Sequence, residues 1–117
     1  MKKIIIIEDD VDTIDILEII LRDNGYAVIK ANRQVPIKEI IAIAPSLAIV
    51  DVRLPFGSGD HLCLEIKSHP KTKNIPVILS SASDNLKKIA ISCHADTYIE
   101  KPFDVDSLLK TVNETIS

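Results

Sequence analysis

The chain has 117 residues, of which 46% are hydrophobic and 26% are charged, and its net charge is −3. This length fits one domain, residues 1–117, and the apolar share is too high for a disordered chain. The dispersed, mildly acidic charge argues against a surface for nucleic acid. The two cysteines form no CxxC pattern and cannot supply a disulfide framework or a zinc site. Since we find neither a signal peptide nor a transmembrane stretch, we expect a cytoplasmic chain with no membrane partner.

Short apolar runs alternate with amphipathic stretches along the chain. Residues 4–7 are a continuous β-branched run, the pattern of a strand that is buried on both faces. Residues 14–21 follow with apolar side chains at helical spacing. A strand-like run followed by a helical pattern then recurs along the chain, at residues 27–29 and 37–43, 47–50 and 62–67, 77–79 and 86–93, and 98–99 and 105–116.

This alternation predicts an α/β fold, (βα)5, in which right-handed crossovers join five parallel strands into a doubly wound sheet. Asp104 is suited to cap the last helix, and Ser83 or Asp84 the helix before it. Cys63 and Cys93 fall on apolar faces, which favours small core residues over a redox pair. The histidines share no spacing, and we expect all of them at the surface: His61, His69 and His94.

Polar side chains follow several of these strands at the point where each strand ends. They are Glu8-Asp9-Asp10 after the first strand, Asp51 after the third, Ser80-Ser81 after the fourth and Glu100-Lys101 after the fifth. The carboxyl ends of parallel strands form the ligand-binding edge of such a sheet, so we expect these groups to converge. Clustered carboxylates need a counter-cation, and Mg²⁺ prefers oxygen ligands. A metal flanked by a lysine and a hydroxyl suits a phosphoryl group.

Four segments combine the apolar runs with the polar residues that follow them: IIIIEDD at 4–10, IVDVRLP at 49–55 with Gly59, IPVILSSA at 75–82, and YIEKPF at 98–103. Taken in order, they resemble the receiver domain of two-component response regulators. The resemblance runs from about residue 3 to residue 116. It implies the flavodoxin-like sheet order 2-1-3-4-5, which periodicity alone does not give.

The resemblance also implies roles at the acidic edge. Asp51 matches the phosphoryl acceptor, which agrees with its isolated place after a central strand. Asp9 matches the direct Mg²⁺ ligand, and Glu8 matches an acid that more often acts on the metal through water. Arg53 matches the position whose backbone carbonyl completes the metal shell. Glu8 is a departure, since aspartate is commonest at its position.

A second group of residues is implied in switching. Lys101 pairs with the acyl phosphate, Ser81 turns toward it, and Tyr98 is the aromatic residue that moves inward with Ser81. These movements bias the face made by the fourth helix, the fifth strand and the fifth helix. The Lys101–Pro102 bond is frequently cis in the family. His94 stands where a glycine is usual, so we expect a different turn before the fifth strand.

We therefore predict a signalling switch and not an enzyme. It would take a phosphoryl group from a sensor histidine kinase or phosphotransfer protein and act on an effector protein or domain, with phosphorylation-dependent dimerisation left open. One alternative is a Mg²⁺-dependent phosphatase of the haloacid dehalogenase type, built on Asp10 and Asp12. Another is a receiver-like interaction module that works without phosphorylation. In either receiver case the chain could be excised from a longer regulator.

Overall fold

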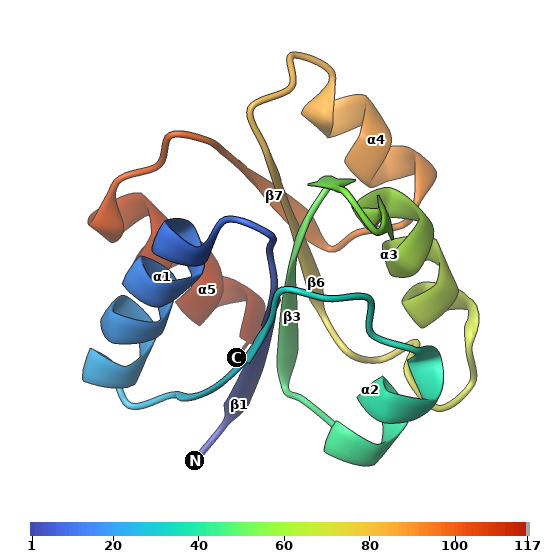
Figure 1. Cartoon of the computed structure of the whole chain (residues 1–117), viewed down its shortest axis with the longest axis horizontal. Coiled ribbons are helices and arrows are strands. Elements are labelled where there is room, and N and C mark those ends of the chain that lie inside the picture. The colour runs from blue at the N-terminus through green and yellow to red at the C-terminus, as the bar shows by residue number, and fades with distance from the viewer. Residues whose placement is uncertain (117) are drawn as a thin grey trace.

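The computed structural model describes residues 1–116, and its centre is a five-stranded parallel sheet in the order β2-β1-β3-β6-β7 (Figure 1). The strands of this sheet are β1 (Lys3–Ile7), β2 (Ala27–Ala31), β3 (Leu47–Asp51), β6 (Val77–Ser81) and β7 (Thr97–Glu100). The helices are α1 (Val11–Asp23), α2 (Ile37–Ile43), α3 (Gly59–Ser68), α4 (Leu86–Ser92) and α5 (Val105–Ile116). Because β6 and β7 are the fourth and fifth strands of the sheet along the chain, the predicted fold and strand order are confirmed.

The sheet separates two apolar clusters. Figure 1 shows α1 and α5 on one side of the sheet and α2, α3 and α4 on the other. Side chains of a strand alternate between its faces, so Ile4 and Ile6 pack toward α1 and α5 while Ile5 and Ile7 pack the other way. All of these isoleucines are fully buried, which explains the continuous apolar run in the sequence.

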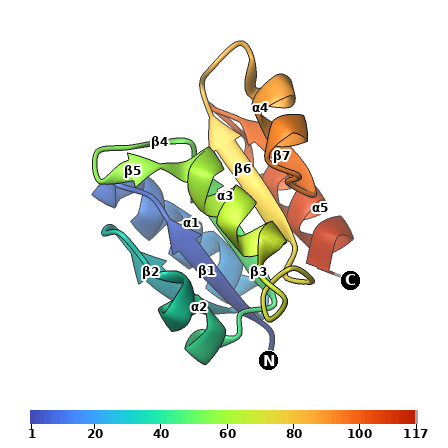
Figure 2. The ribbon, with the colours of Figure 1, turned by 90° about the vertical axis from the view of Figure 1, so that its right-hand side faces the viewer.

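A small hairpin, which the sequence does not predict, interrupts the segment between β3 and α3. Strand β4 (Arg53–Leu54) pairs with β5 (Gly57–Ser58) in antiparallel register. Pro55 and Phe56 form the turn between them, in a segment whose composition indicates only a loop. Figure 2 shows the hairpin at the carboxyl end of the sheet, beside the start of α3. The hairpin therefore lies where a ligand of the sheet edge would bind.

The helix ends match the sequence in part. Asp104 caps α5, because its Oδ1 accepts a hydrogen bond of 2.7 Å from the backbone N–H of Ser107, as predicted. The cap predicted for α4 was wrong: the residue that precedes this helix is Asn85, not Ser83 or Asp84. The carbonyl of Ser83 instead accepts from the N–H of Leu86 at 3.3 Å, which closes a turn ahead of the helix. Within residues 1–116, no helix is long and apolar enough to cross a membrane.

The cysteines lie as the sequence indicates, and two of the three histidines do so. Cys63 and Cys93 are both buried in the α2–α4 side of the core, and burial raises the pKa of the Cys63 thiol, so these are packing residues. His61 and His94 are exposed and His69 is half-buried. His94 adopts a φ of 62°, so the turn before β7 places a histidine in the left-handed conformation that glycine favours.

Ala44, which ends α2, also has a left-handed backbone, with φ 49° and ψ 58°. Because an L-residue is disfavoured there, Ala44→Gly should raise the free energy of unfolding by about 1 kcal/mol. The control is Ala42→Gly, an equally exposed position inside α2, where the same change should lower stability by about 1 kcal/mol. Urea unfolding followed by circular dichroism measures both, and equal signs would contradict the assigned conformation.

Candidate functional site

Three carboxylates meet at the carboxyl edge of the sheet. Glu8 and Asp9 follow β1, and Asp51 is the last residue of β3, the strand next to β1. One carboxylate oxygen from each residue lies within 4.8 Å of the others. Glu8 and Asp51 are only 2% and 7% exposed, whereas Asp9 is exposed to solvent. A cluster of hard oxygen ligands at this spacing fits a small divalent cation such as Mg²⁺.

Lys101 neutralises part of the negative charge of this cluster from the same edge of the sheet, two strands away from β3. It follows β7, and its Nζ donates hydrogen bonds to Glu8 Oε1 and, at 3.2 Å, to Asp51 Oδ2. The peptide bond between Lys101 and Pro102 is cis. Burial opposes the charged ammonium, but the hydrogen bond to Glu8 and the negative charges of both acids outweigh it, so the pKa of Lys101 lies above its usual value.

Glu8 has the most perturbed carboxyl of the site. Burial raises its pKa to about 7, and the adjacent Asp51 acts in the same direction. The ammonium of Lys101 partly opposes both effects. The ammonium of Lys101 therefore offsets part of the repulsion between the two buried carboxyl groups.

The backbone around Asp51 is held by short contacts. Asp51 Oδ1 accepts from the N–H of Arg53 at 3.3 Å, so the first hairpin residue bends back over the carboxylate. The N–H of Gly59, the first residue of α3, donates to the carbonyl of Val52 at 2.8 Å. A Cβ on Gly59 would lie 1.8 Å from the carbonyl oxygen of Asp51, so only glycine allows this approach.

Ser81 and Tyr98 lie on the side of the sheet that faces α3 and α4. Ser81 is buried, and its Oγ accepts from the N–H of Ser83 at 3.1 Å. Tyr98 pairs with Leu79 in the sheet and packs, half-buried, against the same core cluster. The neighbouring Ser80 points to the opposite face, because residues of a strand alternate, and its Oγ has no hydrogen-bond partner within residues 1–116. Of the two serines, only Ser81 shares a face with Tyr98.

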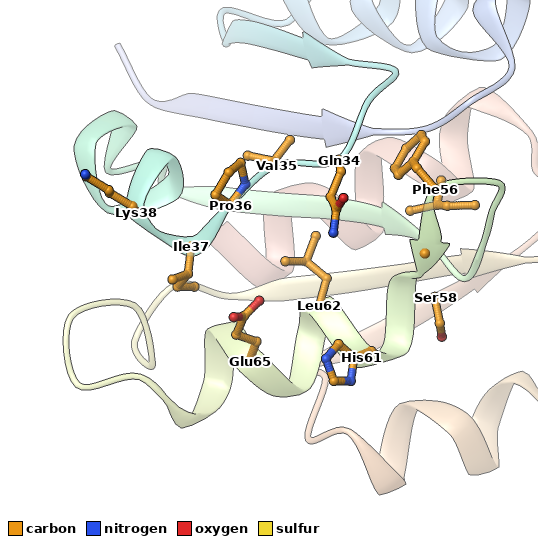
Figure 3. A pocket seen from close by; sticks show the side chains of 12 residues that line it. Gln34, Val35, Pro36, Ile37, Lys38, Phe56, Ser58, His61, Leu62 and Glu65 are labelled. Atoms are coloured by element: carbon orange, nitrogen blue, oxygen red, sulfur yellow. The ribbon is translucent and has the colours of Figure 1, made fainter.

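A separate pocket of about 480 Å³ lies away from the acids (Figure 3). It is bounded by the start of α2, the β4–β5 hairpin and α3, and its walls include Val35, Leu54 and Leu62. None of the clustered acids lines it. A second pocket, between α1 and the segment after β7, has Lys101 in its wall together with Ile16 and Phe103. A third, more open pocket of about 720 Å³ lies at the hairpin and has Asp9 and Arg53 in its wall, so the acidic edge borders this pocket and not the first one.

The phosphatase alternative finds no support at its own residues. Asp10 immediately precedes α1, and its carboxylate accepts a hydrogen bond from the hydroxyl of Thr13, which lowers its pKa. Asp12 lies in the first turn of the helix, where an acid complements the helix dipole. The cluster that could hold a metal is formed by Glu8, Asp9 and Asp51 instead.

Comparison with known proteins decides the family. The sequence profile of the response regulator receiver domain matches residues 4–113. The chain belongs to this family. Receiver domains are signalling switches of two-component systems, and in general they bind Mg²⁺ at an acidic pocket. In this receiver domain Glu8, Asp9 and Asp51 form an acidic group at the sheet edge.

Relatives and solved structures agree with the assignment. The receiver domain is 33% identical to the sensory transduction protein BceR of Halalkalibacterium halodurans, over 96% of the chain and 48% of the relative. It is 32% identical to the DNA-binding dual master transcriptional regulator RpaA of Synechocystis, with the same coverage. A putative response regulator from Chloroflexus aurantiacus superposes with a TM-score of 0.92 at 29% identity, covering 98% of this chain and 97% of that one. The chain thus spans about half the length of these curated relatives.

The close approach of Gly59 to Asp51 gives a test of the site's architecture. Gly59→Ala should lower the free energy of unfolding by about 3 kcal/mol, because the methyl group meets backbone that cannot move aside cheaply. Gly25→Ala is the control: it has a positive φ but open space around it, so it should cost only about 1 kcal/mol. Urea midpoints compare them, and equal losses would argue against tight packing of α3 on Asp51.

Proposed function

We propose that Asp51 accepts a phosphoryl group from the phosphohistidine of a sensor histidine kinase or phosphotransfer protein. The observation that carries this proposal is the hydrogen bond of 3.2 Å between Lys101 Nζ and Asp51 Oδ2, inside a cluster of carboxylates. Asp51 is the member of the cluster that contacts both a cation and the backbone of the hairpin. These contacts hold its carboxylate in one orientation, as a nucleophile requires.

In the proposed reaction, a carboxylate oxygen of Asp51 attacks phosphorus. The oxygen–phosphorus bond forms as the nitrogen–phosphorus bond breaks, and the imidazole leaves with its electron pair. Lys101 neutralises charge on the transferring oxygens. Mg²⁺ would be held by Asp9, Asp51 and the backbone carbonyl of Arg53, and Glu8 would act on the ion through water. The bound ion would further neutralise the negative charge on the transferring oxygens. Water attack on the acyl phosphate would later reset the site.

The proposed output is a change of packing on the α4, β7 and α5 face. The hydroxyl of Ser81 accepts one hydrogen bond in the resting state and can still donate one, so it can turn toward an acyl phosphate. Tyr98 shares that side of the sheet and would fill the space that Ser81 leaves. On α4, Ile91 is 66% exposed and offers an apolar contact for a partner.

We also propose which partners the switch has. A downstream effector protein or domain would bind this face, and phosphorylation-dependent dimerisation through it stays open. The absence of a nucleic-acid or membrane partner is still a prediction for this chain, since one relative is itself named a DNA-binding regulator. A cytoplasmic location and the treatment of residues 1–117 as one receiver domain are also predictions.

The phosphoacceptor is tested by labelling with a small phosphodonor. Acetyl phosphate with Mg²⁺ should produce a shifted band of the wild-type protein on a phosphate-affinity gel, and Asp51→Asn should abolish it, because an amide cannot form the acyl phosphate. Asp10→Asn is the control and should label normally, since Asp10 lies outside the acid cluster. Equal labelling of wild type and Asp51→Asn would refute the assignment, and loss in Asp10→Asn alone would favour the phosphatase.

The proposed metal site is tested by thermal unfolding with and without Mg²⁺. Because a bound cation relieves repulsion among three carboxylates, Mg²⁺ at about 100 times its dissociation constant should stabilise the protein by about 2.7 kcal/mol. EDTA should remove the effect, and Asp9→Asn should largely suppress it. A stabilisation that survives in Asp9→Asn would mean that the ion binds elsewhere. Asp12→Asn, on the exposed first turn of α1, is the matched control.

A further inference from the structure

The pocket between α2, the β4–β5 hairpin and α3 is lined by none of the residues proposed for phosphoryl transfer. Its volume of about 480 Å³ falls within the range of about 300 to 1,000 Å³ that is typical of small-molecule sites. Val35 is its most deeply buried lining residue, at 3% exposed. Half-buried apolar side chains form the walls and pack against the core: Ile37, Leu54, Phe56 and Leu62. The pocket therefore offers a ligand an apolar surface on a packed scaffold.

Two polar side chains border this apolar space (Figure 3). The amide of Gln34 extends from the segment before α2 toward Leu62 on α3. The carboxylate of Glu65, one turn further along α3, extends toward Ile37. Neither of the two polar side chains has a hydrogen-bond or ion-pair partner within residues 1–116. A ligand could therefore use both groups without breaking a contact inside the protein.

The charges around the pocket favour a cationic ligand. Glu65 is the acid among the lining residues. Lys38 also lines the pocket, but its ammonium is directed away from the apolar space (Figure 3). The remaining ionisable lining residue, His61, is exposed. A protonated amine next to Glu65 would therefore meet a carboxylate that no ammonium of the protein neutralises.

We propose that this pocket binds a small aromatic amine, a function beyond phosphoryl transfer. The ring would pack against the apolar walls, where Phe56 offers the offset or edge-on contact that aromatic rings prefer. The ammonium would pair with the carboxylate of Glu65. The amide of Gln34 would make a further hydrogen bond, because it carries both donors and an acceptor.

The β4–β5 hairpin lies between this pocket and the acidic edge. Leu54 and Phe56 of the hairpin line the pocket. Arg53, in the same hairpin, donates its N–H to Asp51 Oδ1 at 3.3 Å. A bound amine would therefore contact the element that bends over Asp51 without contacting Asp51 itself.

The charge preference is measured by NMR titration of the isotope-labelled protein, in which the backbone amide resonances are followed. The probes are tryptamine and indolepropionate, which share a ring and a two-carbon arm and carry opposite charges. Tryptamine should bind with a dissociation constant on the order of 1 mM, as expected for a ligand of this size. Indolepropionate should bind at least about threefold more weakly, because an exposed ion pair contributes little energy. The shifted amides should lie at the start of α2, in the hairpin and in α3.

Glu65→Gln should remove the preference for tryptamine, because it keeps the size of the side chain and loses its charge. Asp106→Asn is the matched control on the exposed first turn of α5. It should keep the preference, which separates Glu65 from general attraction by the net charge of −3. Equal affinity of the wild-type protein for the two probes would overturn the proposal. So would a preference that persists in Glu65→Gln.

The location is tested by filling the pocket. Gln34 is exposed and its side chain borders the pocket, so Gln34→Trp should leave the core intact and weaken tryptamine binding by more than about tenfold. Ser92→Trp places the same side chain at the exposed end of α4 and should bind tryptamine as the wild type does. Wild-type affinity in Gln34→Trp, or amide shifts confined to another surface, would refute the site. Neither titration involves phosphorylation, so these failures are distinct from a failure of Asp51 as acceptor.

Discussion

The ammonium of Lys101 is the interaction on which the acidic edge depends. Glu8 and Asp51 are buried next to each other, and two buried carboxylates at this distance repel strongly unless a cation lies between them. Lys101 supplies that cation from a strand two places away from Asp51 in the sheet. The parallel order of the strands makes this possible, because it brings every carboxyl end to one edge. Removing the ammonium would leave two buried charges without compensation.

A second constraint fixes Asp51 from the opposite side. The N-terminus of α3 packs so closely on β3 that only a residue without a side chain fits at position 59. The hydrogen bond from Gly59 to Val52 and the hairpin that begins at Arg53 continue this attachment. Asp51 is thus held by backbone on one side and by Lys101 on the other. Under the proposed function, a phosphoryl group on its carboxylate would act on both attachments, and that would be the physical basis of switching at this position.

Much of this arrangement could be predicted from sequence because periodicity reports burial. The β-branched run at residues 4–7 gives a strand that is buried on both faces, and the polar residues that follow the apolar runs give the binding edge. Periodicity does not report local geometry, so the β4–β5 hairpin was not predicted, and the cap of α4 was placed at Ser83 or Asp84 instead of Asn85. Nor does it give contacts between distant residues. The glutamate at position 8 is visible in the sequence. Its hydrogen bond to Lys101 becomes evident only when the positions of β1 and β7 in the sheet are known.

The alternation of side chains along β6 links the acidic edge to the surface where partners are proposed to bind. Ser80 and Ser81 are adjacent, yet Ser80 points toward the α1 and α5 side and Ser81 toward α3 and α4. Lys101, which follows β7, contacts Asp51, whereas Ser81 is the last residue of β6 and its hydroxyl contacts the N–H of Ser83. If both bind a phosphoryl group, Lys101 needs little movement because it already contacts Asp51, whereas a turn of Ser81 would shift the acceptor of the hydrogen bond from Ser83. The loop before α4 is consequently the part of the fold that a charge at Asp51 would rearrange.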